Sequence, residues 1–376
     1  MSAPAIPSLQ RAPLPREGLG GWLTSGLGTA LDSALVRAMT FVIERALIPD
    51  PDDIEALRRS AAPMLDPGLQ RAPERFFDFP RHAAPLAVKT RFQRKLAGGV
   101  VKRHQLTTGY EPFLTAVDDD PEPLSQGDPI LLEHWVHERE PTRGTVVALH
   151  GFTMGRPRFD AIALFASHWY ERGLDVALVT MPYHGARTPP EARFSGQRFA
   201  APHVARLSEA VREACYEIGV VTRWLRERSD APVGLLGLSL GGYLTALAAS
   251  LSDELDFAIP MVPPVCIGDL AWRFFRETEH ARSGGSAALS HDELRAAFRV
   301  HSPLAHQLRL PKERVLIVAG RGDRVVPPEH PTALWRHWGD PAIHWFSGSH
   351  LAPFGRGRIV RAIARHLESL DILEKG

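Results

Sequence analysis

Residues 233–249 have the sequence VGLLGLSLGGYLTALAA, and this stretch decides the fold. Residues 233–236 are short and apolar enough for a buried strand, and the residues after Gly242 contain no helix breaker. Between them, Gly237-Leu238-Ser239-Leu240-Gly241 matches the pattern Gly-x-Ser-x-Gly. Between a strand and a helix, this pattern predicts a nucleophile elbow, a strained turn that exposes a serine hydroxyl. The alternative is a tight strand–helix turn without chemistry.

Composition excludes several classes of protein. The 376 residues include 44 basic and 43 acidic side chains, a balance that gives no sign of a nucleic-acid partner. The two cysteines, Cys215 and Cys266, do not make a disulfide framework, and buried free thiols fit a reducing compartment. We find no signal peptide at the N-terminus and no uncharged apolar stretch of the roughly 20 residues that span a bilayer. We therefore expect a cytoplasmic protein.

The first 98 residues are expected to form a partly helical extension of the main domain. Residues 1–18 are rich in proline and alanine, so we expect this start to be disordered. Over residues 20–47, leucines recur along one side of a helical pattern. This stripe favours a helix packed on the main domain, with a helix that contacts a membrane surface or a partner as the alternative. Residues 61–85 show no pattern that assigns an element.

From residue 99 onwards, predicted strands and helices alternate. The expected strands are 100–106 at an edge, 130–136, 145–149, 176–180, 233–236, 257–262, 315–319 and 343–346. The expected helices are 158–172, 203–228, the helix after the elbow, 331–338 and 356–370. This alternation predicts an α/β fold for residues 99–376, with a mostly parallel central sheet covered by helices on both faces.

An activated serine needs a base within reach and a carboxylate that holds the base. Asp323 follows the strand 315–319, and His350 follows the strand that ends at Phe346. Because sites in open parallel sheets form outside the carboxyl ends of the strands, we expect both to lie near Ser239. Taken alone, an aspartate in a glycine turn often only closes the turn, and a single histidine is usually structural. Together, these residues predict a catalytic triad.

The tetrahedral intermediate of acyl transfer also needs two backbone donors. The Leu240 N–H lies at the start of the predicted helix and is one candidate. The second is the N–H of Phe152, in the loop His150-Gly151-Phe152 after strand 145–149, where the small Gly151 lets the backbone approach the substrate. An ordinary strand–helix loop is the alternative. We expect the His150 side chain to brace this loop rather than to catalyse.

These motifs resemble the α/β hydrolases, a superfamily in which the triad follows the order Ser, Asp, His. The resemblance covers residues 99–376 and rests on the elbow, His150-Gly151-Phe152, the turn around Asp323 and the Ser349-His350 pair. It implies the α/β-hydrolase fold and a serine hydrolase. The segment Met181-Pro182-Tyr183-His184-Gly185-Ala186-Arg187-Thr188-Pro189 and the long N-terminal extension are similar to the family of α/β hydrolase domain-containing protein 18.

Residues 263–310 interrupt the alternation at the position where the α/β hydrolases usually carry a lid. Such a segment closes over the serine and shapes the acyl pocket. Trp272, Phe274 and Phe275 are the candidate pocket residues, although packing within a small helical subdomain would also explain them. Asp269 is the second candidate for the triad acid.

The sequence therefore predicts a serine hydrolase that cleaves a carboxylic ester, with a small molecule or a lipid as substrate. The reaction needs neither a metal nor an organic cofactor. Peripheral contact with a membrane through the N-terminal helix is an alternative that the sequence leaves open. A second hypothesis is a serine peptidase similar to prolyl oligopeptidases, although no propeller-sized β-rich region precedes residue 99. A third is a non-catalytic binding protein on the same fold, against which the complete set of three triad residues argues.

Overall fold

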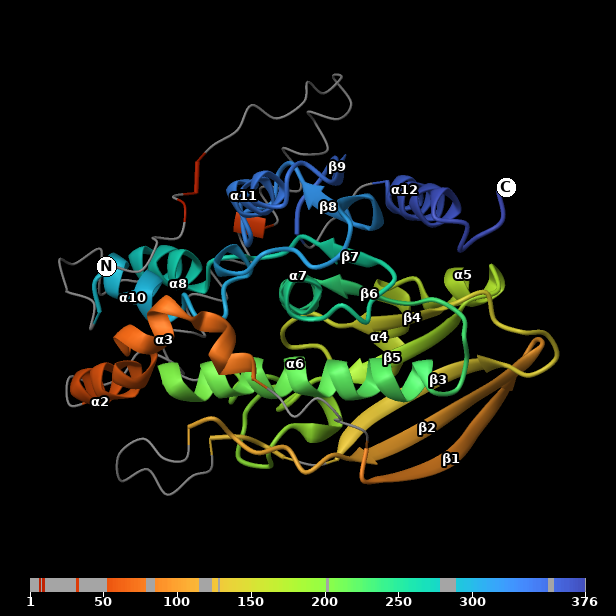
Figure 1. The fold of residues 1–376 in the computed structure, drawn as a ribbon, viewed down its shortest axis with the longest axis horizontal. Helices are drawn as coiled ribbons and strands as arrows, with labels where there is room; N and C mark the ends of the chain where they lie inside the picture. Colours follow the sequence, from red (N-terminus) through yellow and green to blue (C-terminus); the bar gives the residue numbers. More distant parts are fainter. Residues whose placement is uncertain are drawn as a thin grey trace.

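The computed structural model of the chain describes residues 7, 9–10, 32–33, 53–78, 85–114, 124–127, 129–200, 203–277, 289–350 and 355–375. The sheet in this part of the chain comprises β1 (Ala87–Leu96), β2 (Gly99–Thr107), β3 (Ile130–His137), β4 (Thr145–Leu149), β5 (Asp175–Thr180), β6 (Val233–Leu238), β7 (Ala258–Met261), β8 (Leu316–Gly320) and β9 (Ala342–Phe346). The strand order is β1-β2-β3-β5-β4-β6-β7-β8-β9, which Figure 1 shows from the lower edge upwards.

The sheet is mostly parallel, as the sequence predicted. β1, β2, β3 and β5 form antiparallel pairs, and all pairs from β5 through β4 to β9 are parallel. Every residue of β4, β5 and β8 is buried, because helices cover both faces of these strands. The carboxyl ends of the parallel strands consequently meet at one edge of the sheet.

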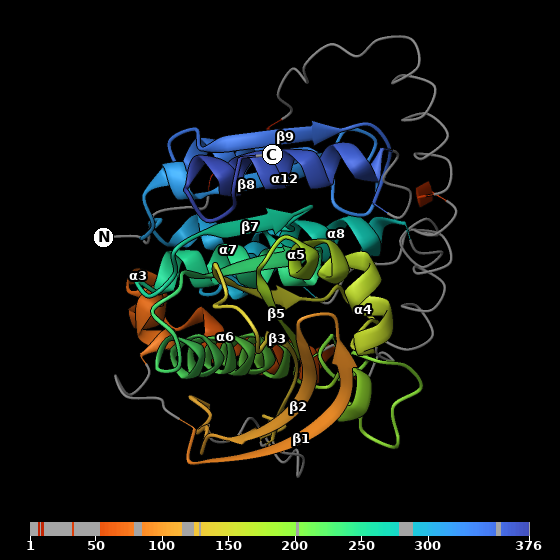
Figure 2. The ribbon, with the colours of Figure 1, turned by 90° about the vertical axis from the view of Figure 1, so that its right-hand side faces the viewer.

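Helices pack on both faces of the sheet. They are α4 (Pro157–Ala163), α5 (Ala166–Glu171), α6 (Val204–Arg226), α7 (Leu240–Leu251), α11 (Glu329–His337) and α12 (Arg356–Ser369). Two further helices, α8 (Ile267–Arg276) and α10 (His291–Ala297), pack against each other in the insert. One apolar core lies under α6, α7 and α11, and a second lies under α5 and α12. Figure 2 shows α6 and α4 on opposite sides of the sheet. The predicted α/β fold class is confirmed.

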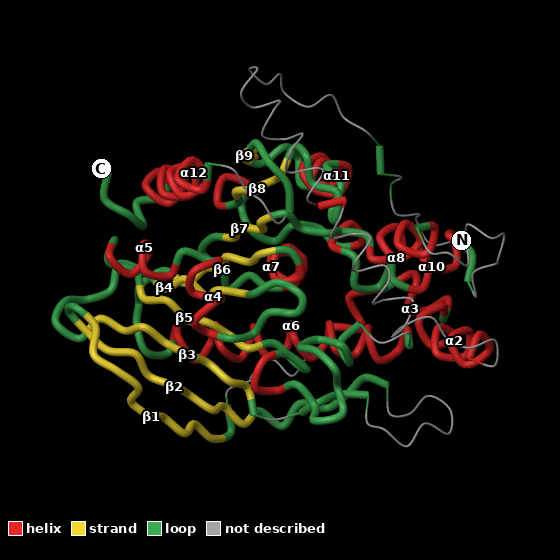
Figure 3. Tube along the Cα trace, turned by 180° about the vertical axis from the view of Figure 1, so that it is seen from behind, coloured by secondary structure: helices red, strands yellow, loops and turns green. Residues whose placement is uncertain are grey.

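The described part of the N-terminal extension packs on the main domain. It forms α2 (Asp53–Ala61), the 3-10 helix η1 (Ala62–Leu65), α3 (Pro67–Arg71) and the 3-10 helix η2 (Pro73–Phe77). Met64 and Phe76 are fully buried in the core under α6. Figure 3 shows these elements beside α8 and α10 of the insert. The helix predicted over residues 20–47 lies outside the described residues except for Asp32 and Ser33, as does most of the start predicted to be disordered.

Two predicted elements were wrong. β2 is not the edge strand, because β1 pairs outside it. β1 escaped prediction because nearly all of its side chains are exposed, which removes the alternation that marks a half-buried strand. The sheet therefore begins inside the range assigned to the extension. The helix predicted over 158–172 is divided into α4 and α5 at Phe165, whose φ of 58° no helix accommodates.

The described residues contain no helix that is both long and apolar enough to cross a membrane.

Candidate active site

Ser239 lies between the end of β6 and the first residue of α7, in a strained backbone conformation. Its φ is 56° and its ψ is −111°, values that cost a non-glycine residue on the order of 1–3 kcal/mol. Flanking contacts hold this conformation: the Ser239 N–H donates to the Met261 carbonyl at 2.9 Å, and the Ser239 carbonyl accepts from the Tyr243 N–H at 2.8 Å. The turn has the strand–turn–helix geometry that the sequence predicted for a nucleophile elbow.

The glycines around Ser239 are required by close backbone approaches. A Cβ atom at Gly237 would lie 2.0 Å from the Gly241 carbonyl oxygen, and one at Gly241 would lie 2.1 Å from the Leu149 carbonyl oxygen. At Gly242, a Cβ atom would lie 2.5 Å from the Met261 carbonyl oxygen. Backbone atoms cannot move aside as a side chain can. The missing side chains therefore let α7 approach the ends of β4 and β7 and fix the position of Ser239.

We predict that Gly241→Ala lowers the free energy of unfolding by on the order of 3 kcal/mol, because the added methyl group overlaps backbone atoms of β4. Helix propensity alone predicts the opposite sign, since alanine is the better helix former. Gly219→Ala is the matched control: this glycine lies inside α6, and a Cβ atom there meets nothing within 4 Å. Urea denaturation should show Gly219→Ala to be neutral or more stable by about 0.5–1 kcal/mol. Equal stability of the two variants would contradict the packing argument.

The structure brings together the three side chains of the predicted triad. His350 Nε2 lies 2.9 Å from Ser239 Oγ, and His350 Nδ1 lies 2.7 Å from Asp323 Oδ2. The other carboxylate oxygen of Asp323 accepts from the N–H groups of Val325 at 2.9 Å and Val326 at 2.7 Å. The two contacts of the His350 ring, with Ser239 Oγ and with Asp323 Oδ2, both lie within hydrogen-bond distance. A continuous chain therefore runs from the carboxylate through the imidazole to the serine hydroxyl.

The charges around His350 favour the protonated form of its imidazole. Burial acts to lower the pKa of His350, but Asp323 and, more weakly, Asp32 outweigh it and raise the pKa above its ordinary value of 6.5. Burial raises the pKa of Asp323 above its ordinary 3.8, although His350 acts in the opposite direction. An imidazole with a raised pKa is a stronger base for the serine proton.

The two candidate oxyanion donors lie beside the serine. A Cβ atom at Gly151 would lie 3.6 Å from Ser239 Cβ, so the loop that carries Phe152 adjoins the elbow. Leu240 is the first residue of α7. Within the described residues, neither the Phe152 N–H nor the Leu240 N–H donates to another protein group. These amides remain available for a substrate oxygen.

His150 makes the contacts of a bracing residue. Its Nδ1 bonds the Gly151 carbonyl at 2.9 Å, and its Nε2 accepts from the Met181 N–H at 3.2 Å. Burial lowers the pKa of His150 to about 4, so the ring is neutral. The segment 181–189 is likewise built into the fold, since Arg187 forms two hydrogen bonds of 2.7 Å with the buried Glu217.

The three candidate pocket residues of the insert make different contacts. Phe274 packs against Val325 and Val326, in the loop that carries Asp323. Trp272 stacks on Phe275, with ring centroids 5.6 Å apart, and on His291 at 5.5 Å. All three aromatic side chains of the predicted pocket are partly exposed.

Asp269, the second candidate for the acid, lies on α8 and pairs elsewhere. Its carboxylate bonds Arg295 at 2.6 Å and His291 at 2.6 Å. Of the two candidate acids, Asp323 is the one that contacts the His350 ring.

Asp32 was not among the predicted site residues. This fully buried side chain accepts hydrogen bonds from the N–H groups of Arg324 at 3.0 Å and His350 at 2.8 Å. Asp32 lies among the recurring leucines of residues 20–47. It is 292 residues from Arg324 and 318 residues from His350 along the chain, so no local pattern indicated these contacts.

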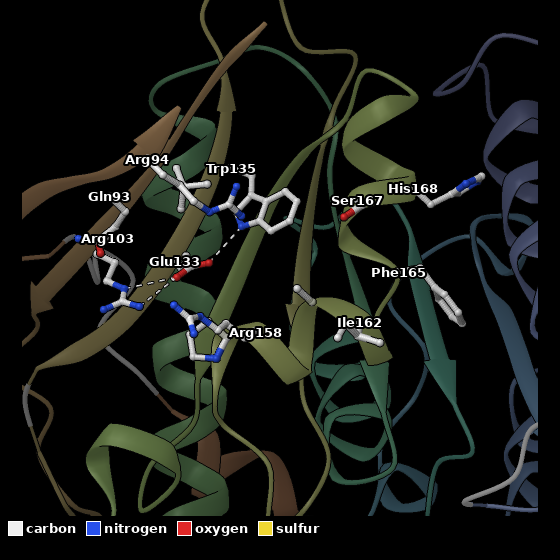
Figure 4. Close-up of a pocket in the computed structure, with 13 residues that line it drawn as sticks. Gln93, Arg94, Arg103, Glu133, Trp135, Arg158, Ile162, Phe165, Ser167 and His168 are labelled. Carbon is white, nitrogen blue, oxygen red and sulfur yellow. Dashed lines mark hydrogen bonds and ion pairs between the residues drawn. The ribbon is translucent and has the colours of Figure 1, made fainter. Parts of the chain in front are cut away.

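A surface groove of about 480 Å³ lies between β1–β3 and α4, apart from the predicted triad. Figure 4 shows Glu133 within it, accepting from Trp135 Nε1 at 3.2 Å and from Arg103 Nε at 3.3 Å. The Arg94 guanidinium lies 4.8 Å from the Trp135 ring. The polar side chains on its strand side thus pair with one another, and none of the predicted triad or oxyanion residues lines the groove.

The sheet order, the strained turn at the end of β6 and the positions of Asp323 and His350 after β8 and β9 define the α/β-hydrolase fold. Comparison with known proteins agrees. Residues 136–271 match the family model described as Alpha/beta hydrolase domain containing 18. The predicted resemblance to α/β hydrolases is confirmed.

Two proteins of Mycobacterium tuberculosis, both described as uncharacterized, are similar in sequence to this chain. The uncharacterized protein Rv2627c of Mycobacterium tuberculosis (strain ATCC 25618 / H37Rv) is 33% identical over 255 residues, covering 65% of this chain and 57% of that protein. An uncharacterized protein of the strain CDC 1551 / Oshkosh matches with the same identity and coverage. The chain therefore spans little more than half the length of these relatives.

Solved structures share the fold at low identity. Acetyl xylan esterase 1 from Thermoanaerobacterium sp. JW/SL YS485 aligns with a TM-score of 0.55 and 14% identity, covering 86% of this chain and 95% of that chain. An acetyl xylan esterase from Paenibacillus sp. R4 aligns with a TM-score of 0.52 and 14% identity, covering 86% of this chain and 96% of that chain. At this identity the alignments establish the fold alone.

Proposed function

We propose that this protein is a serine hydrolase that cleaves carboxylic esters through an acyl-enzyme on Ser239. The observation that carries the proposal is the hydrogen-bonded chain from Asp323 through His350 to Ser239 Oγ. A serine hydroxyl on a strained turn, a base in contact with it and a carboxylate behind the base are the parts that acyl transfer requires. The esterases among the solved structures with this fold support the choice of an ester.

Each residue has one role in the proposed reaction. His350 Nε2 takes the proton of Ser239 as Oγ attacks the ester carbonyl, and the Phe152 and Leu240 amides donate to the oxyanion that forms. His350 then gives the proton to the leaving alcohol, and the acyl group remains on Ser239. In the second half, His350 removes a proton from water as the water oxygen attacks the acyl carbon. The bond from this carbon to Ser239 Oγ then breaks, His350 returns the proton to Oγ, and the carboxylic acid leaves. Asp323 holds the ring and stabilises its charged form throughout.

The substrate class follows from this chemistry. We propose a small-molecule or lipid ester, acted on without a metal or organic cofactor and without a nucleic-acid partner. The even charge balance argues against a nucleic-acid partner, and the free, buried Cys215 and Cys266 support a cytoplasmic location.

The direct test treats the wild-type protein with a fluorophosphonate probe and measures its intact mass. We expect one phosphonyl group per chain, located on Ser239 by peptide mapping. The labelled and unlabelled proteins are then assayed with esters whose acyl chains run from acetyl to palmitoyl, and with prolyl peptides. Ester hydrolysis that labelling abolishes supports the proposal. Cleavage of peptides alone would indicate a peptidase, and a folded protein without labelling or turnover would indicate a binding protein.

We further propose that residues 263–310 form a lid whose aromatic residues set the preference for acyl length. Phe274 is the strongest candidate because it packs on the loop that carries Asp323. Phe274→Ala is expected to change the ratio of kcat/KM for long and short acyl esters by roughly tenfold, because pocket volume enters the binding of the acyl group in the transition state.

The exposed Phe92 on β1 provides a control variant, Phe92→Ala, that should leave this ratio unchanged. The same measurement on Trp272→Ala and Phe275→Ala tests the other two aromatic residues. An unchanged ratio in all three insert variants would mean that the insert only packs.

A further inference from the structure

Asp32 connects the two loops that carry the proposed acid and base. The same carboxylate oxygen, Oδ2, accepts from the N–H of Arg324 at 3.0 Å and from the N–H of His350 at 2.8 Å. Arg324 is the residue after Asp323, so both donors belong to or adjoin the triad. The Asp32 side chain is fully buried, and hydrogen bonds between a carboxylate and backbone N–H groups are short and strong.

Backbone hydrogen bonds also join the two loops on the strand side of the triad. The Arg321 N–H donates to the Phe346 carbonyl at 3.1 Å, and the Gly322 N–H donates to the Gly348 carbonyl at 2.9 Å. These two bonds continue the pairing of β8 with β9. Further along both loops, Asp32 joins them at Arg324, which follows the acid Asp323, and at His350, which carries the imidazole. Its loss would leave two backbone donors without their acceptor, a costly change for buried groups.

Asp32 also contributes charge. The carboxylates of Asp323 and Asp32 are the groups that raise the pKa of His350 against its burial. On the neighbouring α8, Arg273 interacts with Asp323 and Arg324 through its charge. A negative charge beside an imidazole stabilises its protonated form, which is the form that the proposed reaction passes through.

We propose that Asp32 is a positioning residue of this site: its carboxylate fixes the loops of Asp323 and His350 relative to each other, and so holds the His350 ring against Ser239. The inference rests on the proposed function for its catalytic consequence. It also assigns a task to one described residue of the N-terminal extension.

The test compares Asp32→Asn and Asp32→Ala with wild type in the full chain. Asp32→Asn retains an acceptor oxygen without the charge, whereas Asp32→Ala removes both. Asp175→Ala is the matched control, because Asp175 is also buried and accepts a backbone hydrogen bond, from the His137 N–H at 2.9 Å. Asp175 opens β5, at the opposite end of the strands from the predicted triad. Thermal unfolding sets a temperature at which all variants are folded.

Two measurements follow at that temperature. In steady-state kinetics, we expect Asp32→Ala to lower kcat by roughly 10- to 100-fold with little change in KM, since small displacements of reacting groups are that costly. In NMR titrations of protein with labelled histidine, with His350 assigned through a His350→Gln variant, we expect the pKa of His350 to fall in Asp32→Asn. Asp175→Ala should lower stability and leave kcat and the His350 titration as in wild type.

The outcomes separate this inference from the proposed function. If wild type hydrolyses esters and folded Asp32→Asn keeps both its kcat and its His350 titration, the inference is overturned and the function stands. If wild type hydrolyses no ester and yet the titration of His350 differs further between Asp32→Ala and Asp32→Asn, the function fails and the positioning role stands, because the charge is absent from both variants. If Asp32→Ala does not fold, the kcat and the His350 titration of Asp32→Asn are the measurements that support or contradict the inference.

Discussion

Replacing Ser239 with alanine is expected to abolish labelling by a fluorophosphonate and to lower ester turnover by on the order of 10⁴-fold or more. The reason is chemical, because alanine leaves His350 without a hydroxyl to deprotonate and the acyl group without an oxygen to bind. The fold should survive. Ser239 Oγ makes its hydrogen bond with His350 at the surface of the site, and the strained φ of 56° costs alanine about as much as serine. Intact mass after treatment with the probe measures labelling, steady-state kinetics measures turnover, and circular dichroism measures whether the fold is retained.

A second serine of α7 provides the control. Ser250 is buried near the other end of the helix, where its hydroxyl donates to the Ala246 carbonyl at 3.1 Å. Ser250→Ala also removes one hydroxyl from α7, so it should keep both labelling and turnover. If folded Ser239→Ala were labelled as strongly as wild type, the nucleophile would have to be another residue and the proposed mechanism would fall.

Much of the fold could be predicted because its signals are local. Buried parallel strands such as β4 and β8 appear as continuous apolar runs, and the elbow combines a strand, a glycine turn and a helix within a few residues. Asp323 follows β8, and His350 follows β9, a shorter signal because most of this strand is partly exposed. Since parallel strands end at one edge of the sheet, their positions along the chain were enough to predict that they meet.

The missed features depend on contacts that local patterns do not encode. β1 is exposed along nearly its whole length, and its residues between Ala87 and Leu96 include several lysines and arginines. Phe165, where α4 and α5 are divided, makes a tertiary contact, since the Arg356 guanidinium lies 5.0 Å from its ring. Asp32 reaches His350 from the far end of the chain. No periodicity reports such a contact.

The second large effect on kcat is expected from replacing Asp323, the residue assigned as the acid of the triad in preference to Asp269. We expect Asp323→Asn to lower kcat by roughly 10³- to 10⁴-fold with the fold intact, because an amide misorients the imidazole and cannot balance its charge. Asp323 is rigidly held: Oδ1 accepts from two backbone N–H groups while Oδ2 contacts His350 Nδ1 at 2.7 Å. The side-chain oxygen of asparagine can still accept from Val325 and Val326, which turns the amide nitrogen towards His350. The ring would then have to accept at Nδ1 and carry its proton on Nε2, the atom that must take the proton of Ser239.

Asp269→Asn is the matched comparison, since it also removes one carboxylate that is paired with a histidine. Asp269 neutralises Arg295 and contacts His291 within the insert, so its loss should cost kcat about tenfold or less through the positioning of α8. Steady-state kinetics on both purified variants, with circular dichroism as the measure of folding, decide between the two aspartates. A larger loss in Asp269→Asn than in Asp323→Asn would contradict the assignment of the acid. The roles proposed for Ser239 and His350 would survive that result, because they rest on their own contact of 2.9 Å.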